Sequence, residues 1–513
     1  MRERSRGRLL LIAASAGILA ALAGDTRSIA APKTSPPPDA ARLKDNDAAR
    51  RLADAVISSP ELTSDTLYLC DRIGGRLTGT PACRLAVSWT RSRFEEAGLE
   101  GVRLEPFTLP RAWLPGEGEA RLLAPVAMDL EIATVPYSPD TGSVLEARVF
   151  DAATGSPADI ARQGKSARGA IGLVRTAEMR SLVDLFTEYM RDREMLRAAQ
   201  EAGVAGLLLM STRPRGLLYR HPIRTDGTLT PVPVALVRRE HAQRIGRLLD
   251  SGDEVRVRLA IEGTAGGPIE SHNVIADIPG RERPGEIVLF GAHLDSWDLG
   301  TGAEDNAVNC AAVIAVARAM KQLGLSARRT IRFALFTGEE QGLWGSLDYV
   351  RRHAAELDNH VAVVIMDIGS GRVTGYYLNG REELRGPVVR ALEPVGRFGP
   401  FEHPIEAVDG TDNFDFLLSG VPNLIAAQDM TNYLPDYHAA SDVFETVNGE
   451  QAAKNTAITA ALLWHLAEAR ERPAPRQTRQ EVEELIRRTG LEPQMKAFGQ
   501  WDAWVSGRRG IFN

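Results

Sequence analysis

The sequence predicts an α/β protein: a mixed, mostly parallel sheet flanked by helices, with a smaller mixed α/β unit inserted into it. From residue 271 onward, uninterrupted apolar runs alternate with helical stretches, the pattern of strands that are covered on both faces. Between about residues 138 and 265 the pattern is that of a small mixed unit without clustered metal ligands or nucleophiles. The chain has 513 residues, of which 44% are hydrophobic and 25% charged, so it can bury a large core.

The predicted main domain takes its elements from two stretches of the chain. Residues 49–137 open with helical periodicity at Ala49 and continue with short strand-like runs. Residues 266–470 contain four mainly apolar runs of strand length. The predicted strands are residues 102–109, 129–135, 287–290, 331–336, 361–366 and 423–427, and the further predicted helices are residues 88–98, 307–323, 343–353 and 452–469.

The inserted unit, residues 138–265, is expected to shape or cover a site that the main domain builds. Its predicted strands are residues 170–174, 206–210 and 232–237, and its predicted helices are residues 196–202 and 240–249. Residues 471–513 form a charged tail with several prolines and one helix near residues 481–488. The sequence indicates no function for this tail.

The first residues have the pattern of an export signal. Four arginines precede an uncharged apolar run from Leu9 to Ala23, which ends in small residues. The run is short for a membrane span, so residues 1–23 are predicted to be a cleaved signal peptide and residues 24–48 a linker. We expect a secreted or periplasmic protein without stable membrane insertion. In an oxidising compartment Cys70 and Cys83 could pair, and the sequence leaves this open.

Composition excludes several classes of function. The chain has 61 basic and 67 acidic residues, a formal charge of −6 and no basic stripe, which argues against nucleic acid as the main partner. Three cysteines are too few for a disulfide scaffold. The sequence has no His-Glu-x-x-His motif, no Gly-x-Ser-x-Gly motif and no phosphate-binding glycine pattern after a strand.

Metal-binding residue types follow the predicted strands of the main domain. In sheets of this kind, functional residues gather at the carboxyl ends of the strands. Two histidines and at least three carboxylates at such positions suit two divalent ions such as zinc. The candidates, in chain order, are His293, Asp295, Asp305, Glu339, Glu340, Asp367, His438 and Asp442.

The candidate types fit hydrolysis assisted by two metal ions. A carboxylate has two oxygens and can bridge two cations, and Asp305 at a helix start is short enough to be held rigidly. Of the adjacent pair Glu339 and Glu340, one can bind metal while the other takes a proton from water and passes it to the leaving amine. From the residues alone, these two glutamates could exchange roles.

Four segments resemble the M28 family of zinc aminopeptidases, and especially its carboxypeptidase Q branch. The resemblance covers most of residues 50–470, and the inserted unit is similar to a protease-associated (PA) domain. Val308-Asn309, Asn413 and Ala439 depart from the usual family pattern but leave the proposed ligands intact. The segments that carry the resemblance are Gly291 to Ser296, Gly302 to Asn306, Thr337 to Gly342 and Tyr437 to Asp442.

The resemblance implies a role for each candidate residue and two zinc ions per chain. Asp305 would bridge both ions, His293 and Asp367 would complete one site, and Glu340 and His438 the other. Glu339 would be the general base. Asp295 would orient His293 through its second ring nitrogen, and Asp442 would support the His438 loop in the same way. Residues on the substrate side would be Asp412 and Tyr433, and the branch resembled suggests a homodimer.

The predicted function is that of a secreted dizinc exopeptidase acting on dipeptides or short peptides with a free N-terminus. A hydroxide bridging the zinc ions would attack the peptide carbonyl while Glu339 carries the proton. Aminopeptidase action on longer peptides and carboxypeptidase action stay open. Two further alternatives are a glutaminyl cyclase, which shares the fold but typically uses one metal, and a non-catalytic peptidase-like interaction protein.

Overall fold

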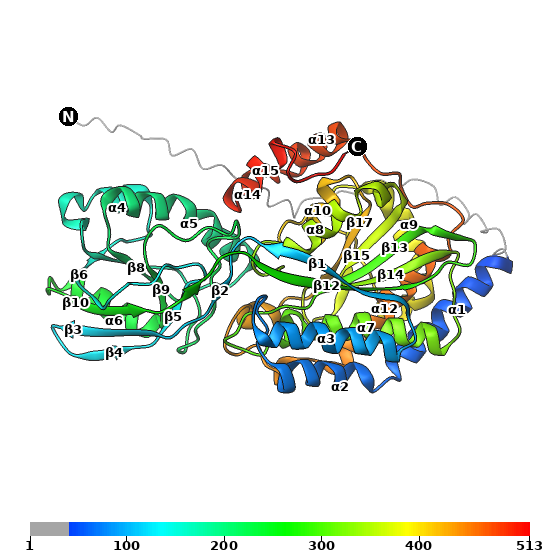
Figure 1. The fold of residues 1–513 in the computed structure, drawn as a ribbon, viewed down its shortest axis with the longest axis horizontal. Helices are drawn as coiled ribbons and strands as arrows, with labels where there is room; N and C mark the ends of the chain where they lie inside the picture. Colours follow the sequence, from blue (N-terminus) through cyan, green and yellow to red (C-terminus); the bar gives the residue numbers. More distant parts are fainter. Residues whose placement is uncertain (1–39, 513) are drawn as a thin grey trace, which may run out of the picture. The chain divides into compact units, whose positions relative to one another are not determined.

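The computed structural model describes residues 40–512 (Figure 1). The predicted signal peptide and most of the predicted linker lie outside these residues. Helix α1 (Ala40–Ile57) begins before the predicted start at Ala49. The residues from Lys44 onward form one compact unit. Within the described part of the chain, no helix is both long and apolar enough to cross a membrane.

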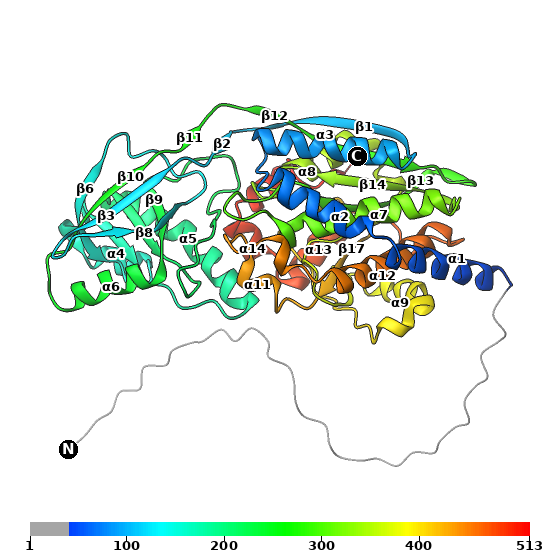
Figure 2. The ribbon, with the colours of Figure 1, turned by 90° about the horizontal axis from the view of Figure 1, so that it is seen from below.

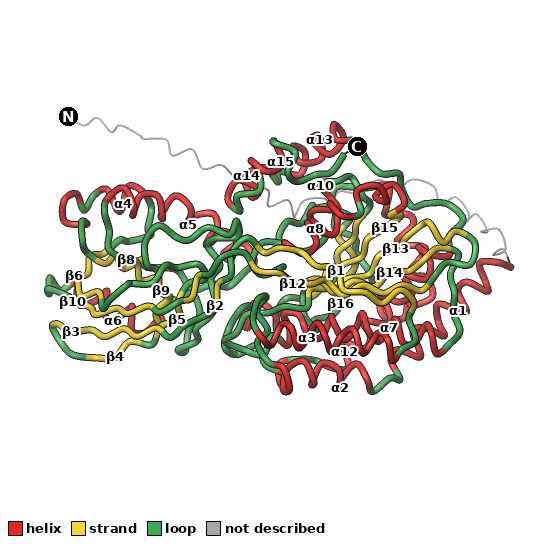
Figure 3. Tube along the Cα trace, in the orientation of Figure 1, coloured by secondary structure: helices red, strands yellow, loops and turns green. Residues whose placement is uncertain are grey.

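A seven-stranded mixed sheet forms the main domain, in the order β1-β12-β14-β13-β15-β17-β16 (Figure 3). The four inner strands are parallel: β14 (Arg329–Phe336), β13 (Arg283–His293), β15 (His360–Ile365) and β17 (Asn423–Gln428). The outer strands pair antiparallel: β1 (Glu100–Leu109), β12 (Ile269–Ile278) and β16 (Val373–Tyr377). The predicted mixed sheet is confirmed, with its parallel pairing confined to the inner strands.

Helices cover both faces of this sheet, which explains the uninterrupted apolar runs of its strands. Along β13, Val288 and Phe290 enter the core beneath α7 and α12, whereas Ile287 and Leu289 enter a second core beneath α8 and α10. Figures 1 and 2 show the two helical layers. The helices of this domain are α2 (Glu61–Leu67), α3 (Pro81–Glu96), α7 (Val308–Gln322), α8 (Trp344–Arg352), α9 (Arg385–Leu392), α10 (Phe414–Leu418), α11 (Tyr433–Asp436) and α12 (Gly449–Glu468).

The inserted module has its own eight-stranded sheet, in the order β4-β3-β10-β6-β7-β8-β9-β5. The chain reaches it through β2 (Trp113–Leu114) and leaves it through β11 (Thr264–Ala265), and these two strands pair antiparallel. Its strands are β3 (Gly118–Ala124), β4 (Met128–Leu130), β5 (Ile132–Thr134), β6 (Leu145–Asp151), β7 (Ile171–Val174), β8 (Gly206–Met210), β9 (Val234–Val237) and β10 (Arg256–Ile261), and its helices are α4 (Pro157–Ala161), α5 (Leu182–Ala202) and α6 (Arg239–Asp250).

Two features differ from the sequence-based expectation. The module begins at β3, so the predicted boundary at residue 138 lies inside it, because β3 to β5 pair with its strands rather than with the main sheet. The tail forms three helices instead of one: α13 (Arg479–Thr489), α14 (Glu492–Ala497) and α15 (Trp501–Val505). Apolar residues of the tail pack against α10, which ties the tail to the main domain.

The three cysteines are free and buried, so the pairing of Cys70 with Cys83 that the sequence left open is not formed. Cys83 lies in α3, where its Sγ is 3.8 Å from Oγ1 of Thr78. Burial raises the pKa of the Cys83 thiol to about 12 and that of Cys70 to about 11. Both therefore act as small apolar core residues.

Candidate metal centre

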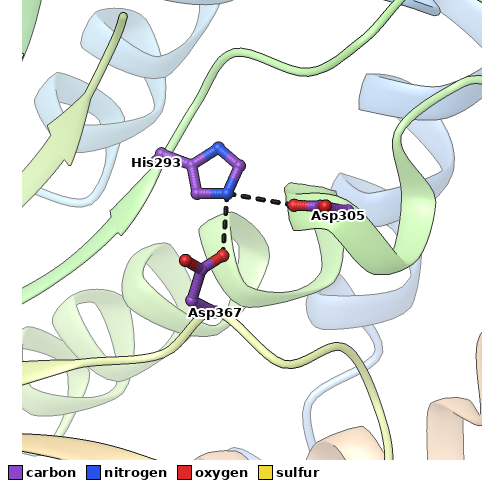
Figure 4. Close-up of side chains that lie close together, drawn as sticks. All are labelled: His293, Asp305 and Asp367. Carbon is purple, nitrogen blue, oxygen red and sulfur yellow. Dashed lines mark hydrogen bonds and ion pairs between the residues drawn. The ribbon is translucent and has the colours of Figure 1, made fainter. Parts of the chain in front are cut away.

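The side chains predicted to bind metal meet at the carboxyl ends of the parallel strands, in two groups that share Asp305. In the first group, Nε2 of His293 lies 2.7 Å from Oδ1 of Asp367 and 3.1 Å from Oδ1 of Asp305 (Figure 4). In the second, Nε2 of His438 lies 3.0 Å from Oε2 of Glu340 and 3.6 Å from Oδ2 of Asp305. The ligand atoms of each group lie within 4.8 Å of one another. Asp305 thus presents one oxygen to each group.

The electrostatics of the two groups fit bound cations. Burial raises the pKa of Glu340 well above its usual value, and it raises that of Asp367 as well. Among the described residues, neither carboxylate forms an ion pair with lysine or arginine, and Oε1 of Glu340 has no hydrogen-bond partner. Burial lowers the pKa of His438 to about 3, so this imidazole is neutral and has a free lone pair that can bind a metal ion. Clustered buried carboxylates with neutral imidazole form a donor set that suits zinc or a similar ion.

Asp305 is fixed by backbone contacts at the start of its helical segment. Gly302 has φ +61°, a left-handed conformation that suits glycine. The Asp442 carboxylate then accepts hydrogen bonds from the N–H groups of Ala303 (3.0 Å), Glu304 (2.7 Å) and Asp305 (3.2 Å). The prediction that Asp442 supports His438 was therefore wrong, since Asp442 holds the segment that carries Asp305.

Asp295 also has a different partner from the one predicted. Nδ1 of His293 bonds to the backbone carbonyl of Asp295 at 2.9 Å, while its carboxylate lies 3.9 Å away. The carboxylate instead accepts a hydrogen bond from Oγ1 of Thr78 (3.0 Å) and one from the N–H of Glu339 (3.3 Å). The residue thus orients His293 through its backbone and positions Glu339 through its side chain.

The sequence analysis missed the role of Asn306, which binds one of the candidate metal ligands. Its Nδ2 donates to Oδ1 of Asp367 and to the carbonyl of Met366, both at 3.0 Å. The first bond fixes the carboxylate that faces His293. The sequence offered one indication of this role, since Asn306 directly follows the candidate ligand Asp305.

The comparisons with known proteins agree with this geometry. Residues 273–463 match the model of peptidase family M28. This segment is an M28 peptidase domain, and it contains all the candidate metal ligands. It is 27% identical to carboxypeptidase Q of Homo sapiens and 28% identical to that of Rattus norvegicus, and each match covers 79% of this chain and 84% of the relative.

Solved structures of other peptidases show the same fold. The crystal structure of a peptidase M28 precursor from Shewanella amazonensis aligns with TM-score 0.78 and 28% identity, covering 85% of this chain and 100% of that one. A zinc aminopeptidase from Bacillus subtilis aligns with TM-score 0.64 and 21% identity, over 81% of this chain and 97% of the other. The second likeness concerns the fold alone.

A cavity of about 370 Å³ opens onto the candidate metal ligands. Glu339 lines it and is partly accessible, and the surrounding protein raises its pKa well above the usual value by burial. Tyr433 also lines it, and its hydroxyl donates to Oδ2 of Asp305 at 3.1 Å. Asp412 is fully buried and lies outside the lining, so its predicted place on the substrate side does not match the structure. Burial raises the pKa of Asp412 to about 8.

The inserted module contacts the metal centre directly, which the sequence analysis missed. His438 has φ +57°. The chain at His438 to Ala440 pairs antiparallel with residues 218–220 of the module. The N–H of Arg220 donates to the His438 carbonyl (2.9 Å), Nδ1 of His438 lies 3.3 Å from the Arg220 carbonyl, and the N–H of Ala440 donates to the Leu218 carbonyl (3.0 Å). The module therefore supplies the backbone oxygen that faces the second ring nitrogen of this ligand.

The Arg220 side chain fixes this contact. Its guanidinium binds the Asp298 carboxylate through two bonds of 2.8 and 2.7 Å, and it donates to the Thr134 carbonyl at 2.7 Å. Asp298 follows the metal-binding strand end closely, five residues after His293. No residue pattern near Arg220 indicated this contact, because its partners are distant in the sequence.

Proposed function

We propose that this M28 enzyme is an exported dizinc exopeptidase that removes the N-terminal residue of dipeptides and short peptides. The observation that carries the proposal is the pair of ligand groups sharing Asp305, with Glu339 beside them in one cavity. The apolar N-terminal run with preceding arginines supports export. The peptidase names of the relatives support the reaction class.

The residues of the centre have distinct tasks in this reaction. Asp305, with His293 and Asp367 on one side and Glu340 and His438 on the other, would hold the two ions. When bound, the ions supply Lewis-acid polarisation of the peptide carbonyl and lower the pKa of the attacking water.

Glu339 is placed to move the proton. It lines the cavity next to the ligands, and the N–H···carboxylate contact with Asp295 fixes its backbone. As a base it takes the proton of the attacking water, and as an acid it gives a proton to the leaving amine.

The charges along the cavity favour a free N-terminus over a free C-terminus. Beyond the metal ligands, its described lining includes the exposed Glu406 and the partly accessible Glu339, and it contains no lysine or arginine. Carboxylate recognition in proteins commonly uses arginine, whereas an acidic lining attracts an ammonium group. Aminopeptidase action therefore fits this cavity better than carboxypeptidase action.

A panel of blocked and unblocked peptides tests the proposal. We expect Leu-Ala and Leu-Ala-amide to be cleaved and N-acetyl-Leu-Ala to be resistant. Chelator should abolish cleavage, and zinc should restore it. Cleavage of the N-acetylated peptide alone would contradict the proposal in favour of a carboxypeptidase, and cyclisation of N-terminal glutamine without hydrolysis would indicate a cyclase. Light scattering of the same preparation tests the predicted homodimer.

Glu339→Gln separates catalysis from metal binding. We expect a fall in kcat of about 10²–10⁴-fold with the zinc content unchanged, because the amide cannot shuttle a proton. Glu402→Gln is the matched control, since this glutamate is exposed and does not line the cavity. Wild-type turnover in Glu339→Gln would refute the assigned role, and loss of zinc instead of turnover would show that Glu339 and Glu340 have exchanged roles.

A further inference from the structure

The C-terminal tail reaches the cavity although it lies outside the M28 match. Gln494, Phe498 and Gln500 of the tail are part of the lining. Helix α5 of the inserted module contributes an apolar stretch to the same lining. Figure 2 shows α14 and α5 next to each other, and the two helices are in contact. The residues of α5 in the lining are Leu182, Leu185, Phe186 and Tyr189.

The tail is attached to the inserted module at this wall. The rings of Phe498 and Tyr189 lie 5.5 Å apart. The Phe498 carbonyl accepts a hydrogen bond from Oγ1 of Thr225 (3.1 Å), and the Lys496 carbonyl accepts one from Nη1 of Arg193 (2.9 Å). These bonds to backbone carbonyls fix the tail in place without using its side chains, which leaves the Phe498 ring as part of the wall.

The end of the tail is attached to the loop that carries the general base. Arg509 is buried, and it forms an ion pair with Asp415 (2.9 Å) and donates to the Gly342 carbonyl (2.9 Å). The N–H of Gly342 in turn donates to the Glu339 carbonyl at 2.9 Å. The tail is therefore bound to both modules, and Phe498 has a defined position relative to Glu339.

The lining residues of the tail and α5, together with the candidate metal ligands, indicate which chemical group the cavity binds. In the proposed reaction the attacked carbonyl would lie beside the metal ligands and Glu339, which leaves the rest of the cavity lining to contact the side chain of the same residue. That surface includes two phenylalanines, Phe498 and Phe186, both partly accessible. Aromatic rings of this kind stabilise a bound apolar group by removing its surface from water.

We propose that Phe498 of the tail, together with Phe186 of α5, binds an apolar side chain of the N-terminal substrate residue and so determines specificity. This inference rests on the proposed function. Neither residue lies in the segment that matches the family, so the specificity of this enzyme would be set by the parts of the chain added to the M28 domain.

Product binding and turnover test the inference separately. For the zinc-loaded wild type, we expect kcat/KM for Leu-Ala to exceed that for Ala-Ala by at least about tenfold, the usual effect of added methylenes in an apolar pocket. In Phe498→Ala this ratio should fall about tenfold, mainly through KM, with kcat for Ala-Ala retained. Titration calorimetry with the free product amino acids should show that Phe498→Ala binds leucine over alanine with a correspondingly smaller preference than the wild type.

Two further variants protect the test against misfolding. Phe498→Leu keeps an apolar group and should retain part of the preference, whereas Phe186→Ala should lower it from the other side of the wall. Val505→Ala, an exposed position of α15 outside the lining, is the matched control and should leave the ratio unchanged.

The possible outcomes distinguish a failure of the specificity inference from a failure of the proposed function. An unchanged leucine preference in Phe498→Ala and Phe186→Ala, in binding and in turnover, would overturn the inference and leave the proposed function standing. Leucine binding that depends on Phe498 without any peptide hydrolysis would support the inference and contradict the proposed function. A wild type that binds leucine and alanine equally would also overturn the inference.

Discussion

Replacement of Asp298 by asparagine tests whether the inserted module stabilises the metal centre. Asp298 binds the guanidinium of Arg220, and the backbone of Arg220 pairs with His438 on both sides. Asp298→Asn removes the charge and keeps the size of the side chain. The result should be a looser Arg220 segment, and therefore a less well oriented His438, with little change at His293.

The expected magnitude follows from the burial of the pair. The side chain of Arg220 is 5% exposed and that of Asp298 is 22% exposed. Loss of one partner from a fully buried pair costs about 3–5 kcal/mol. Because Asp298 is partly solvated and Arg220 keeps its bond to the Thr134 carbonyl, we expect about 2 kcal/mol. If this cost is transmitted to the ion at Glu340 and His438, its affinity falls about 30-fold, within the range of about 10–100-fold typical of residues that orient ligands.

Chelator competition with zinc measures this effect. The wild type should release its two ions in steps, and Asp298→Asn should shift one step by about 30-fold and leave the other in place. Glu146→Gln is the matched control, since Glu146 pairs with Arg258 on the exposed surface of the same module, where such pairs contribute little. An equal shift of both steps, or none, would refute the argument that the module acts on one ligand through Arg220.

Three further predictions concern single residues. Asp305→Ala should reduce the zinc content measured by mass spectrometry from two ions to one or none, because Asp305 contributes to both groups, and retention of both ions would contradict the shared-ligand geometry. Thr78→Val removes the hydroxyl that donates to Asp295 and accepts from the N–H of Gly338, so kcat should fall about tenfold with both ions bound, and a change confined to KM would contradict this. Burial lowers the pKa of His360 to about 4 from an ordinary 6.5, because the folded protein disfavours the charged imidazole. Above pH 6.5 His360 is neutral in both the folded and the unfolded chain and costs no stability. As the pH falls from 6.5 toward 4, the unfolded chain takes up the proton first, and the free energy of unfolding decreases. Urea unfolding of metal-free protein should show a loss of about 2 kcal/mol through His360 between pH 7.5 and 5, and His360→Asn should lack it.

The metal ligands were predictable because their positions depend on sheet topology. Parallel strands with apolar runs end at the same edge, so His293 at the end of β13 and Asp367 just after β15 had to approach one another. The supporting contacts were not predictable in the same way. The Asp295 carbonyl and the N–H groups that Asp442 holds belong to the backbone, and every residue type offers such groups.

The module boundary and the tail were missed for reasons of packing. The short runs that form β3 to β5 have the same alternation whether they pair with one sheet or another, and only their partners decide the assignment. The helices of the tail expose polar residues on most positions, and the few apolar ones, such as Leu485 and Trp504, become informative only when α10 is packed against them. A sequence without its tertiary contacts contains neither kind of information.

Three separate parts of the chain converge on the cavity, and their contacts suggest why they stay together. The main domain supplies the metal ligands, the inserted module holds His438 through Arg220, and the tail contacts both the module and the Glu339 loop. A shift of the module relative to the main domain would therefore move a metal ligand and the Phe498 wall at the same time. Metal affinity and side-chain preference should then change together in variants of the contact between module and main domain, such as Asp298→Asn, whereas Phe498→Ala should change side-chain preference alone. Measurement of both quantities in Asp298→Asn, and again in Phe498→Ala, distinguishes such coupling from two independent sites.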